Sequence, residues 1–169
     1  TIESIAKESL MKYENELTVA KKEYPENKML IKRLKKGKGN HLDNKFHNLH
    51  EEVFEKIDCL DCANCCKTTS PIFLETDIER LSKALKMKTS AFKDEYLKID
   101  SDNDWVLKTA PCPFLGLDNK CIAYIHRPKA CREYPHTNRK RIYQILNLTL
   151  ENSLICPAVS KILQRIEAQ

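Results

Sequence analysis

The chain has 169 residues, and with 41% hydrophobic and 31% charged residues its composition indicates a soluble globular protein and excludes a disordered one. No run approaches the roughly 18 apolar residues of a membrane helix, and the charged start of the chain lacks an apolar signal core, so the sequence favours a cytoplasmic location and no membrane partner. The formal net charge is +5. The eight cysteines are fewer than a disulfide-stapled secreted chain of this length usually has, which favours metal ligands or catalytic thiols.

The first part of the chain predicts an all-helical N-terminal arm over residues 1–56. Apolar residues recur at helical spacing across residues 3–23 and again from Phe46 to Ile57. Between them, residues 26–36 predict a second, strongly basic helix.

Shorter elements are predicted after the first cysteines. Thr76 and Glu79 have the spacing of a capping box that opens a helix, and a second helix is predicted over residues 91–98. Two strands are predicted over residues 104–109 and 120–124, and a third over the apolar and β-branched residues 141–150. Apolar residues at helical spacing predict a C-terminal helix over residues 159–166.

These elements predict a mainly α fold with a small antiparallel β-hairpin region (α+β), organised around a cysteine-ligated metal site. The predicted domain organisation is the helical arm, residues 1–56, followed by a cysteine-cluster metal-binding domain with the C-terminal helix, residues 57–169.

The segment IDCLDCANCCKT, residues 57–68, contains four closely spaced thiols: Cys59, Cys62, Cys65 and Cys66. A Cys-x2-Cys pair lets two sulfurs converge on one ion, as in zinc knuckles. Three cysteines at this spacing are also typical of the run that wraps an iron–sulfur cluster, whose fourth ligand comes from a distant Cys-Pro pair. Both Cys112-Pro113 and Cys156-Pro157 offer such a pair.

The adjacent Cys65 and Cys66 suggest two centres, because neighbouring side chains of an extended backbone point to opposite sides. One hypothesis assigns Cys59, Cys62, Cys65 and Cys156 to one centre and Cys66, Cys112, Cys121 and Cys131 to another. The spacing permits this partition without establishing it, and it leaves zinc and an iron–sulfur cluster open. Four disulfides are the alternative, which the adjacent pair makes difficult.

Basic and aromatic residues alternate with the thiols in CIAYIHRPKACREYPH, residues 121–136. Guanidinium groups of Arg127 and Arg132 beside thiolates would offset negative charge and donate hydrogen bonds to sulfur. Alternatively, both arginines cap helix ends or pair with surface carboxylates. His126 and His136 are the candidate acid–base groups or metal ligands, although a fully thiolate site needs neither.

Three motifs together resemble the YkgJ-type CxxCxxCC cysteine-cluster family, a zinc- or iron-chelating domain. They are CxxCxxCC at 59–66, PCPFL at 111–115 and CxxYxxRPxxCRxYP at 121–135. The resemblance covers about residues 57–158 and implies that all eight cysteines belong to the metal-binding set. Related sequences are often labelled iron–sulfur oxidoreductases, and a similar domain occurs in flagellin lysine methylases.

The sequence therefore predicts a thiolate protein that binds metal ions, iron as an iron–sulfur cluster or zinc, in one or two centres, with electron transfer as one role. The first alternative is an iron–sulfur or metal-dependent oxidoreductase, and the question of catalysis stays open. The second is a zinc-stabilised module that binds nucleic acid or protein, since residues 28–38 contain six basic residues and no acid; such a pattern is more often a solvated helix face. A redox or protein partner is not specified by the sequence.

Overall fold

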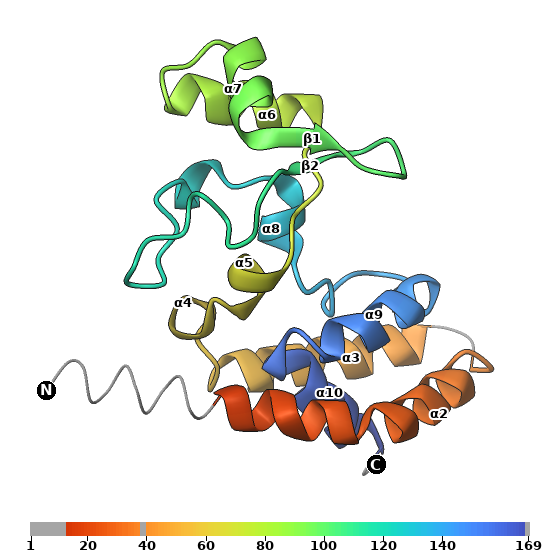
Figure 1. Ribbon diagram of the computed structural model, residues 1–169. Coiled ribbons are helices and arrows are strands. Elements are labelled where there is room, and N and C mark those ends of the chain that lie inside the picture. The colour runs from red at the N-terminus through yellow and green to blue at the C-terminus, as the bar shows by residue number, and fades with distance from the viewer. Residues whose placement is uncertain (1–12, 38–39, 168–169) are drawn as a thin grey trace, which may run out of the picture. The chain divides into compact units, whose positions relative to one another are not determined.

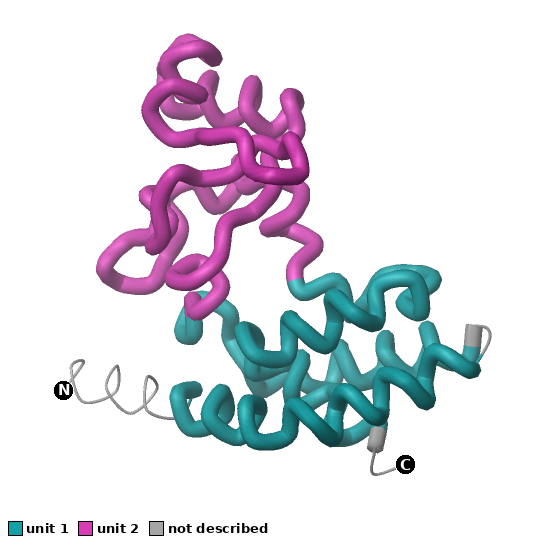
Figure 2. Tube along the Cα trace, turned by 45° about the vertical axis from the view of Figure 1, so that its right-hand side comes forward, with its two compact units in different colours: residues 1–62, 135–169 teal, residues 63–134 magenta. Residues whose placement is uncertain are grey.

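The computed structural model describes residues 13–37 and 40–167 (Figure 1). These residues are mainly helical, with one two-stranded antiparallel sheet, as the sequence predicts. The chain divides into two compact units (Figure 2): unit 1 comprises residues 1–62 and 135–169, and unit 2 comprises residues 63–134. These units are defined by packing, whereas the predicted separation of an arm, 1–56, from a metal-binding region, 57–169, concerns function and stays a prediction.

The described residues of unit 1 form helices joined by short loops. Residues 13–22 are helical, and the first twelve residues of the chain, part of the helix predicted over 3–23, lie outside the described residues. The other elements are α2 (Tyr24–Leu34), α3 (Asn40–Phe54), α4 (Cys59–Cys62), the 3-10 helix η2 (Ile142–Ile145), α9 (Leu146–Ser153) and α10 (Pro157–Glu167).

Helix α10 is central to the packing of unit 1, where it contacts α2, α3 and α9. Val159, Ile162 and Leu163 are fully buried, and Ile166 is 4% exposed. Because these positions are three, four and seven residues apart, they lie on one face of the helix. The predicted C-terminal helix is therefore confirmed, and its buried side chains belong to the core of unit 1.

The predicted strand over residues 141–150 is wrong, because this segment forms η2 and α9. Ile142, Leu146 and Leu150 are buried, whereas Gln144 and Leu148, which would share their face in a strand, are exposed. The burial therefore follows the spacing of a helix and not the alternation of a strand. The carboxylate of the buried Asp43, from α3, accepts hydrogen bonds from the N–H groups of Arg141 (2.6 Å) and Ile142 (2.9 Å). These long-range contacts hold the beginning of η2.

Unit 2 combines short helices with the sheet. Its elements are α5 (Asn64–Thr68), α6 (Glu75–Ala84), α7 (Thr89–Tyr96), β1 (Leu97–Ile99), β2 (Trp105–Leu107), the 3-10 helix η1 (Tyr124–His126) and α8 (Lys129–Glu133). Strand β1 pairs with β2 in antiparallel register, with Leu97 opposite Leu107.

The strand predicted over residues 104–109 is confirmed by β2, but its partner differs from the prediction. The partner is β1, which reaches β2 through a short turn held by the Asp100 carboxylate. Closing so short a loop costs little entropy. The strand predicted over residues 120–124 is wrong, since that segment makes only an isolated bridge between Leu115 and Cys121 and then enters η1.

The core of unit 2 is built around Phe92, which is fully buried. Its ring lies parallel to that of Phe114, with centroids 6.1 Å apart. Cys112 and Cys121 pack against this core at its edge, so the aromatic packing also positions two thiols. The buried members are Phe73, Ile78, Leu81, Phe92, Leu97, Leu107, Phe114 and Ala123.

Phe92→Ala is expected to destabilise unit 2 by about 3–5 kcal/mol, because it removes a large side chain from a closed core. Denaturant unfolding followed by the fluorescence of Trp105, the only tryptophan of the chain, measures this loss. Leu117→Ala is the matched control, since the Leu117 side chain is 109% exposed. Equal stability of the two variants would contradict the assignment of Phe92 to the core.

Helix α6 begins at Glu75, one residue before Thr76, so the capping box predicted from Thr76 and Glu79 is wrong. Instead, the Asp77 carboxylate accepts a hydrogen bond from the backbone N–H of Leu74, at 3.2 Å. A carboxylate in the first turn also interacts favourably with the helix dipole.

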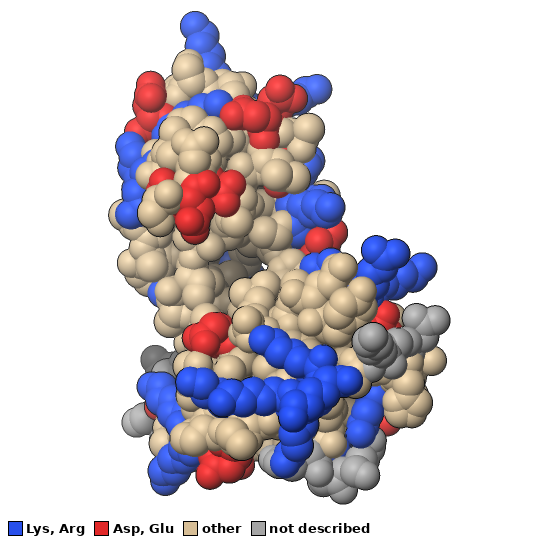
Figure 3. Space-filling view, turned by 90° about the vertical axis from the view of Figure 1, so that its right-hand side faces the viewer, with Lys and Arg blue, Asp and Glu red and all other residues tan. Residues whose placement is uncertain are grey.

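Helix α2 carries most of the predicted basic segment. Lys28, Lys32, Arg33, Lys35 and Lys36 are exposed, while Leu30 and Ile31 are buried; Lys38 lies outside the described residues. Met29, which the helical pattern places on the buried side, is 56% exposed. Figure 3 shows Lys and Arg side chains in a band over the face of unit 1 that it draws. Among the described residues, no helix has the length and apolar character needed to cross a membrane.

Nucleic-acid binding through the basic face of α2 stays a prediction. Such binding should weaken steeply with salt, because phosphate contacts release counterions. Titration of labelled duplex DNA and of single-stranded RNA at about 50 and 200 mM salt measures this dependence. An absence of binding at the lower salt concentration would contradict the prediction.

Candidate metal centre

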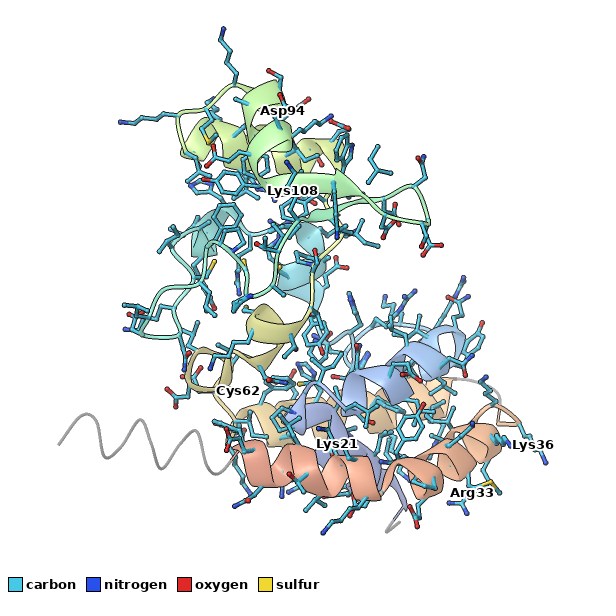
Figure 4. All side chains as sticks on the ribbon, in the orientation of Figure 1. Lys21, Arg33, Lys36, Cys62, Asp94 and Lys108 are labelled. Atoms are coloured by element: carbon cyan, nitrogen blue, oxygen red, sulfur yellow. The ribbon has the colours of Figure 1, made fainter. Side chains whose placement is uncertain are left out.

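The eight cysteines carry free thiols and are distributed over both units. In unit 1, Cys59 and Cys62 begin and end α4, and Cys156 directly precedes α10; Figure 4 labels Cys62. In unit 2, two cysteines lie in α5, two lie at the edge of the aromatic core and one lies in α8: Cys65, Cys66, Cys112, Cys121 and Cys131. Cys65 and Cys66 are therefore helical neighbours, and the extended backbone assumed for them is wrong.

Four cysteines of unit 2, from separate chain segments, act electrostatically on one another. Ionised Cys66 raises the pKa of Cys112, Cys121 and Cys131. The backbone contributes to this grouping, because the N–H of Cys112 donates to the carbonyl of Cys66 at 2.8 Å. The fold of unit 2 thus places the thiols of α5, of the loop after β2 and of α8 near one another.

Three of these four thiols are neutral at neutral pH. Burial, reinforced by nearby thiolates, raises the pKa of Cys112 to about 11 and that of Cys131 to about 12, and burial also raises the pKa of Cys121. Cys66 differs, because its pKa is lowered to about 7. The main cause is a hydrogen bond from Cys65, and the charges of Arg127 and Lys67 add to this effect, whereas burial opposes it.

Backbone N–H groups point at several of these sulfurs and favour their ionised form. The N–H groups of Phe114 and Leu115 act on Cys112, and that of Ala123 acts on Cys121. In unit 1, Val159 and Ala158 act in the same way on Cys156. Hydrogen bonds from peptide N–H groups to sulfur stabilise metal-bound thiolates and tune the bound metal. The donor set therefore fits zinc or iron by its chemistry.

The thiols of unit 1 form a smaller group. Burial, with a smaller contribution from the charges of Cys59 and Cys62, raises the pKa of Cys156 to about 12. Tyr13, which the sequence pattern identified only as an apolar helix position, lies near Cys62: burial and then the charge of Cys62 raise the Tyr13 pKa.

Within residues 13–37 and 40–167, no group of three or more Cys, His, Asp or Glu side chains is arranged closely enough to hold a metal ion. The thiols sense one another's charge, but their sulfurs do not converge. The prediction of a fold organised around a cysteine-ligated metal site is thus not confirmed. Neutral thiols have no strong mutual attraction, and in many small metal proteins the ligands converge only when the metal binds.

Arg127 is the guanidinium that acts on the thiols of unit 2. It donates from Nε to the carbonyl of Tyr124 at 2.8 Å, its Cζ lies 3.5 Å from the centroid of the Tyr124 ring, and its charge lowers the pKa of Cys66, Cys121 and Cys131. Arg132, which the sequence places beside Cys131, donates instead to the Arg127 carbonyl at 2.8 Å. Arg132 therefore contacts the backbone of the residue whose charge acts on the thiols.

Sequence reasoning missed Asp77 and Arg80, which contact the same loop from α6. Arg80 donates from Nη2 to the Asp77 carboxylate (2.6 Å) and to the Arg127 carbonyl (2.8 Å). The spacing DIER, with an acid and a base three residues apart, suggests a local helix pair. Nothing in that spacing indicates the second contact, to a residue 47 positions away.

Metal binding by unit 2 is expected to release between three and four protons per ion at about pH 7, because three neutral thiols and a half-ionised Cys66 must all become thiolates. Since protons compete with the metal, the apparent affinity should rise with pH, by roughly three to four powers of ten per pH unit at most. Stopped-flow mixing of metal with metal-free protein in dilute indicator buffer counts the protons. Release of one proton or fewer would contradict a four-thiolate site.

The comparisons with known proteins agree with the thiol pattern. The family model CxxCxxCC, described as "Putative zinc- or iron-chelating domain", matches residues 58–152. The matched segment contains seven of the cysteines and ends before Cys156. Comparison with curated proteins and with solved structures gave no match. Because the matched segment covers more than half of the chain, the protein belongs to the CxxCxxCC family.

Proposed function

We propose that this protein binds zinc or iron through two thiolate centres, one within each compact unit. Cys66, Cys112, Cys121 and Cys131 are the proposed ligands in unit 2. Cys59, Cys62 and Cys156 are those in unit 1. The observation that carries the proposal is the electrostatic grouping of four thiols from separate segments of unit 2. Two of them, Cys112 and Cys121, also receive backbone N–H donors at the edge of the aromatic core.

The chain's own residues would prepare these thiols for metal. Four thiolates around a divalent ion leave a net negative charge, and Arg127 and the peptide N–H groups offset part of it. The Cys112 and Cys121 side chains pack against the core. Because the core restrains these side chains, they would lose less conformational entropy when a metal ion binds. A bound zinc ion would supply structural stability, whereas an iron–sulfur cluster would supply electron transfer.

Elemental analysis with an absorption spectrum tests the proposal, on protein purified anaerobically from cells without added metal. Iron with acid-labile sulfide and a broad band near about 400 nm would support an electron carrier or an iron–sulfur oxidoreductase. Colourless protein with about two zinc ions per chain would support structural or chelating centres. Protein that contains neither metal, and binds neither when it is supplied under reducing conditions, would contradict the proposal.

A further inference from the structure

The loop between Cys121 and Cys131 is held by a polar network that originates in α6. Asp77 is 1% exposed, and its carboxylate accepts hydrogen bonds from Arg80 (2.6 Å), from the N–H of Lys129 (3.1 Å) and from the N–H of Leu74 (3.2 Å). A buried carboxylate is retained at low cost only when such partners compensate its charge. Asp77 therefore joins the beginning of α6 to the beginning of α8, which carries Cys131.

Arg80 extends this network to the backbone of the same loop. It donates from Nη2 to the carbonyl of Arg127 at 2.8 Å and from Nε to the carbonyl of His126 at 3.4 Å. Arg132 donates to the same Arg127 carbonyl, at 2.8 Å. The carbonyl of Arg127 thus accepts hydrogen bonds from two guanidinium groups, while its side chain contacts Tyr124.

We propose that Asp77 and Arg80 are positioning residues for the metal centre of unit 2: they fix residues 126–129, and through them the guanidinium of Arg127 and the thiol of Cys131. This inference rests on the proposed metal centre. The planar guanidinium of Arg80 donates to a carboxylate and two carbonyls together, which a lysine ammonium on a flexible stem does not reproduce in the same geometry.

The test measures how fast the purified, metal-loaded full chain loses metal to excess EDTA, with the metal counted by elemental analysis. Arg80→Gln and Arg127→Gln are each expected to accelerate the loss from one centre by about 10–100-fold, the usual cost of removing a group that orients metal ligands. Because Arg80 acts partly through Arg127, the acceleration of metal loss in the double variant should be smaller than the product of the accelerations in the two single variants.

Glu75→Gln is the matched control. It removes one carboxylate charge from the same helix and breaks the exposed pair with Lys93, at 2.8 Å, so its release rate should stay within about twofold of the unaltered protein. If Arg80→Gln fails to fold, Arg80→Lys serves in its place: the lysine keeps the positive charge beside Asp77 and loses the fork, and it should still accelerate release.

Unaltered release rates in Arg80→Gln, or in Arg80→Lys where that variant is used, would overturn the inference. The inference would also be overturned if the double variant accelerated metal loss by the full product of the two single accelerations. Either result leaves the proposed function intact, because the metal would still be bound. An unaltered protein that neither carries nor takes up metal contradicts the proposed function itself, so the two failures are distinguishable.

Discussion

Removing the metal from the purified protein under reducing conditions is expected to lower the melting temperature of unit 2 by about 15 °C or more. Structural zinc contributes on the order of 10–16 kcal/mol to the folding of zinc-finger peptides. A loss of about 4 kcal/mol already corresponds to roughly 16–32 °C for a small domain. Trp105 lies in β2 of unit 2, so its fluorescence during a thermal scan reports this unit.

Two controls separate the loss of metal from other effects of the chelator. Returning the metal should restore the original melting temperature. The chelator should also change the unit 2 transition of Cys66→Ser much less, since that variant lacks a proposed ligand before the chelator is added. Equal melting temperatures with and without metal would contradict the proposal that ligand convergence contributes to the stability of unit 2.

Single Cys→Ser substitutions are expected to divide into two classes. Cys121→Ser and Cys112→Ser should lose the metal of unit 2, and Cys59→Ser and Cys156→Ser should lose that of unit 1. Each variant should therefore retain about half of the metal content per chain if the two centres hold equal amounts, because a missing thiolate leaves an incomplete ligand set. Elemental analysis and the absorption spectrum of each purified variant measure the outcome.

The two members of each class serve as controls for each other, since they should lose the same spectroscopic feature. If Cys59→Ser and Cys121→Ser abolish the same feature equally, the two-centre proposal is wrong. Cys156→Ser is especially informative, because Cys156 lies beyond the segment that the family model matches. Cys65→Ser completes the series, and its class decides whether Cys65 belongs with Cys59, as the sequence hypothesis states.

Secondary structure was predictable where apolar residues repeat over several turns. The C-terminal helix shows this, because Val159, Ile162 and Ile166 recur at helical spacing and are all buried. The prediction was wrong over residues 141–150, where a β-branched and apolar segment is compatible with both a strand and a helix. The contacts with Asp43 and the packing against α2 decide in favour of a helix.

The same distinction applies to the candidate site. The thiol-rich chemistry was determined by the sequence alone, because Cys59, Cys62, Cys65 and Cys66 are near neighbours whose spacing already limits what their sulfurs can bind. Family membership followed from those local motifs as well.

Only the tertiary structure decided which distant thiols lie near one another and which residues hold them. Cys66 approaches Cys112, Cys121 and Cys131 because three chain segments meet in unit 2, and Asp77 and Arg80 reach the loop of Arg127 from α6. Hydrogen bonds between residues about 50 positions apart leave no periodic pattern in a sequence. The dense cluster of thiols is therefore a local property of this chain, whereas the grouping of distant thiols and the contacts that support them are properties of its fold.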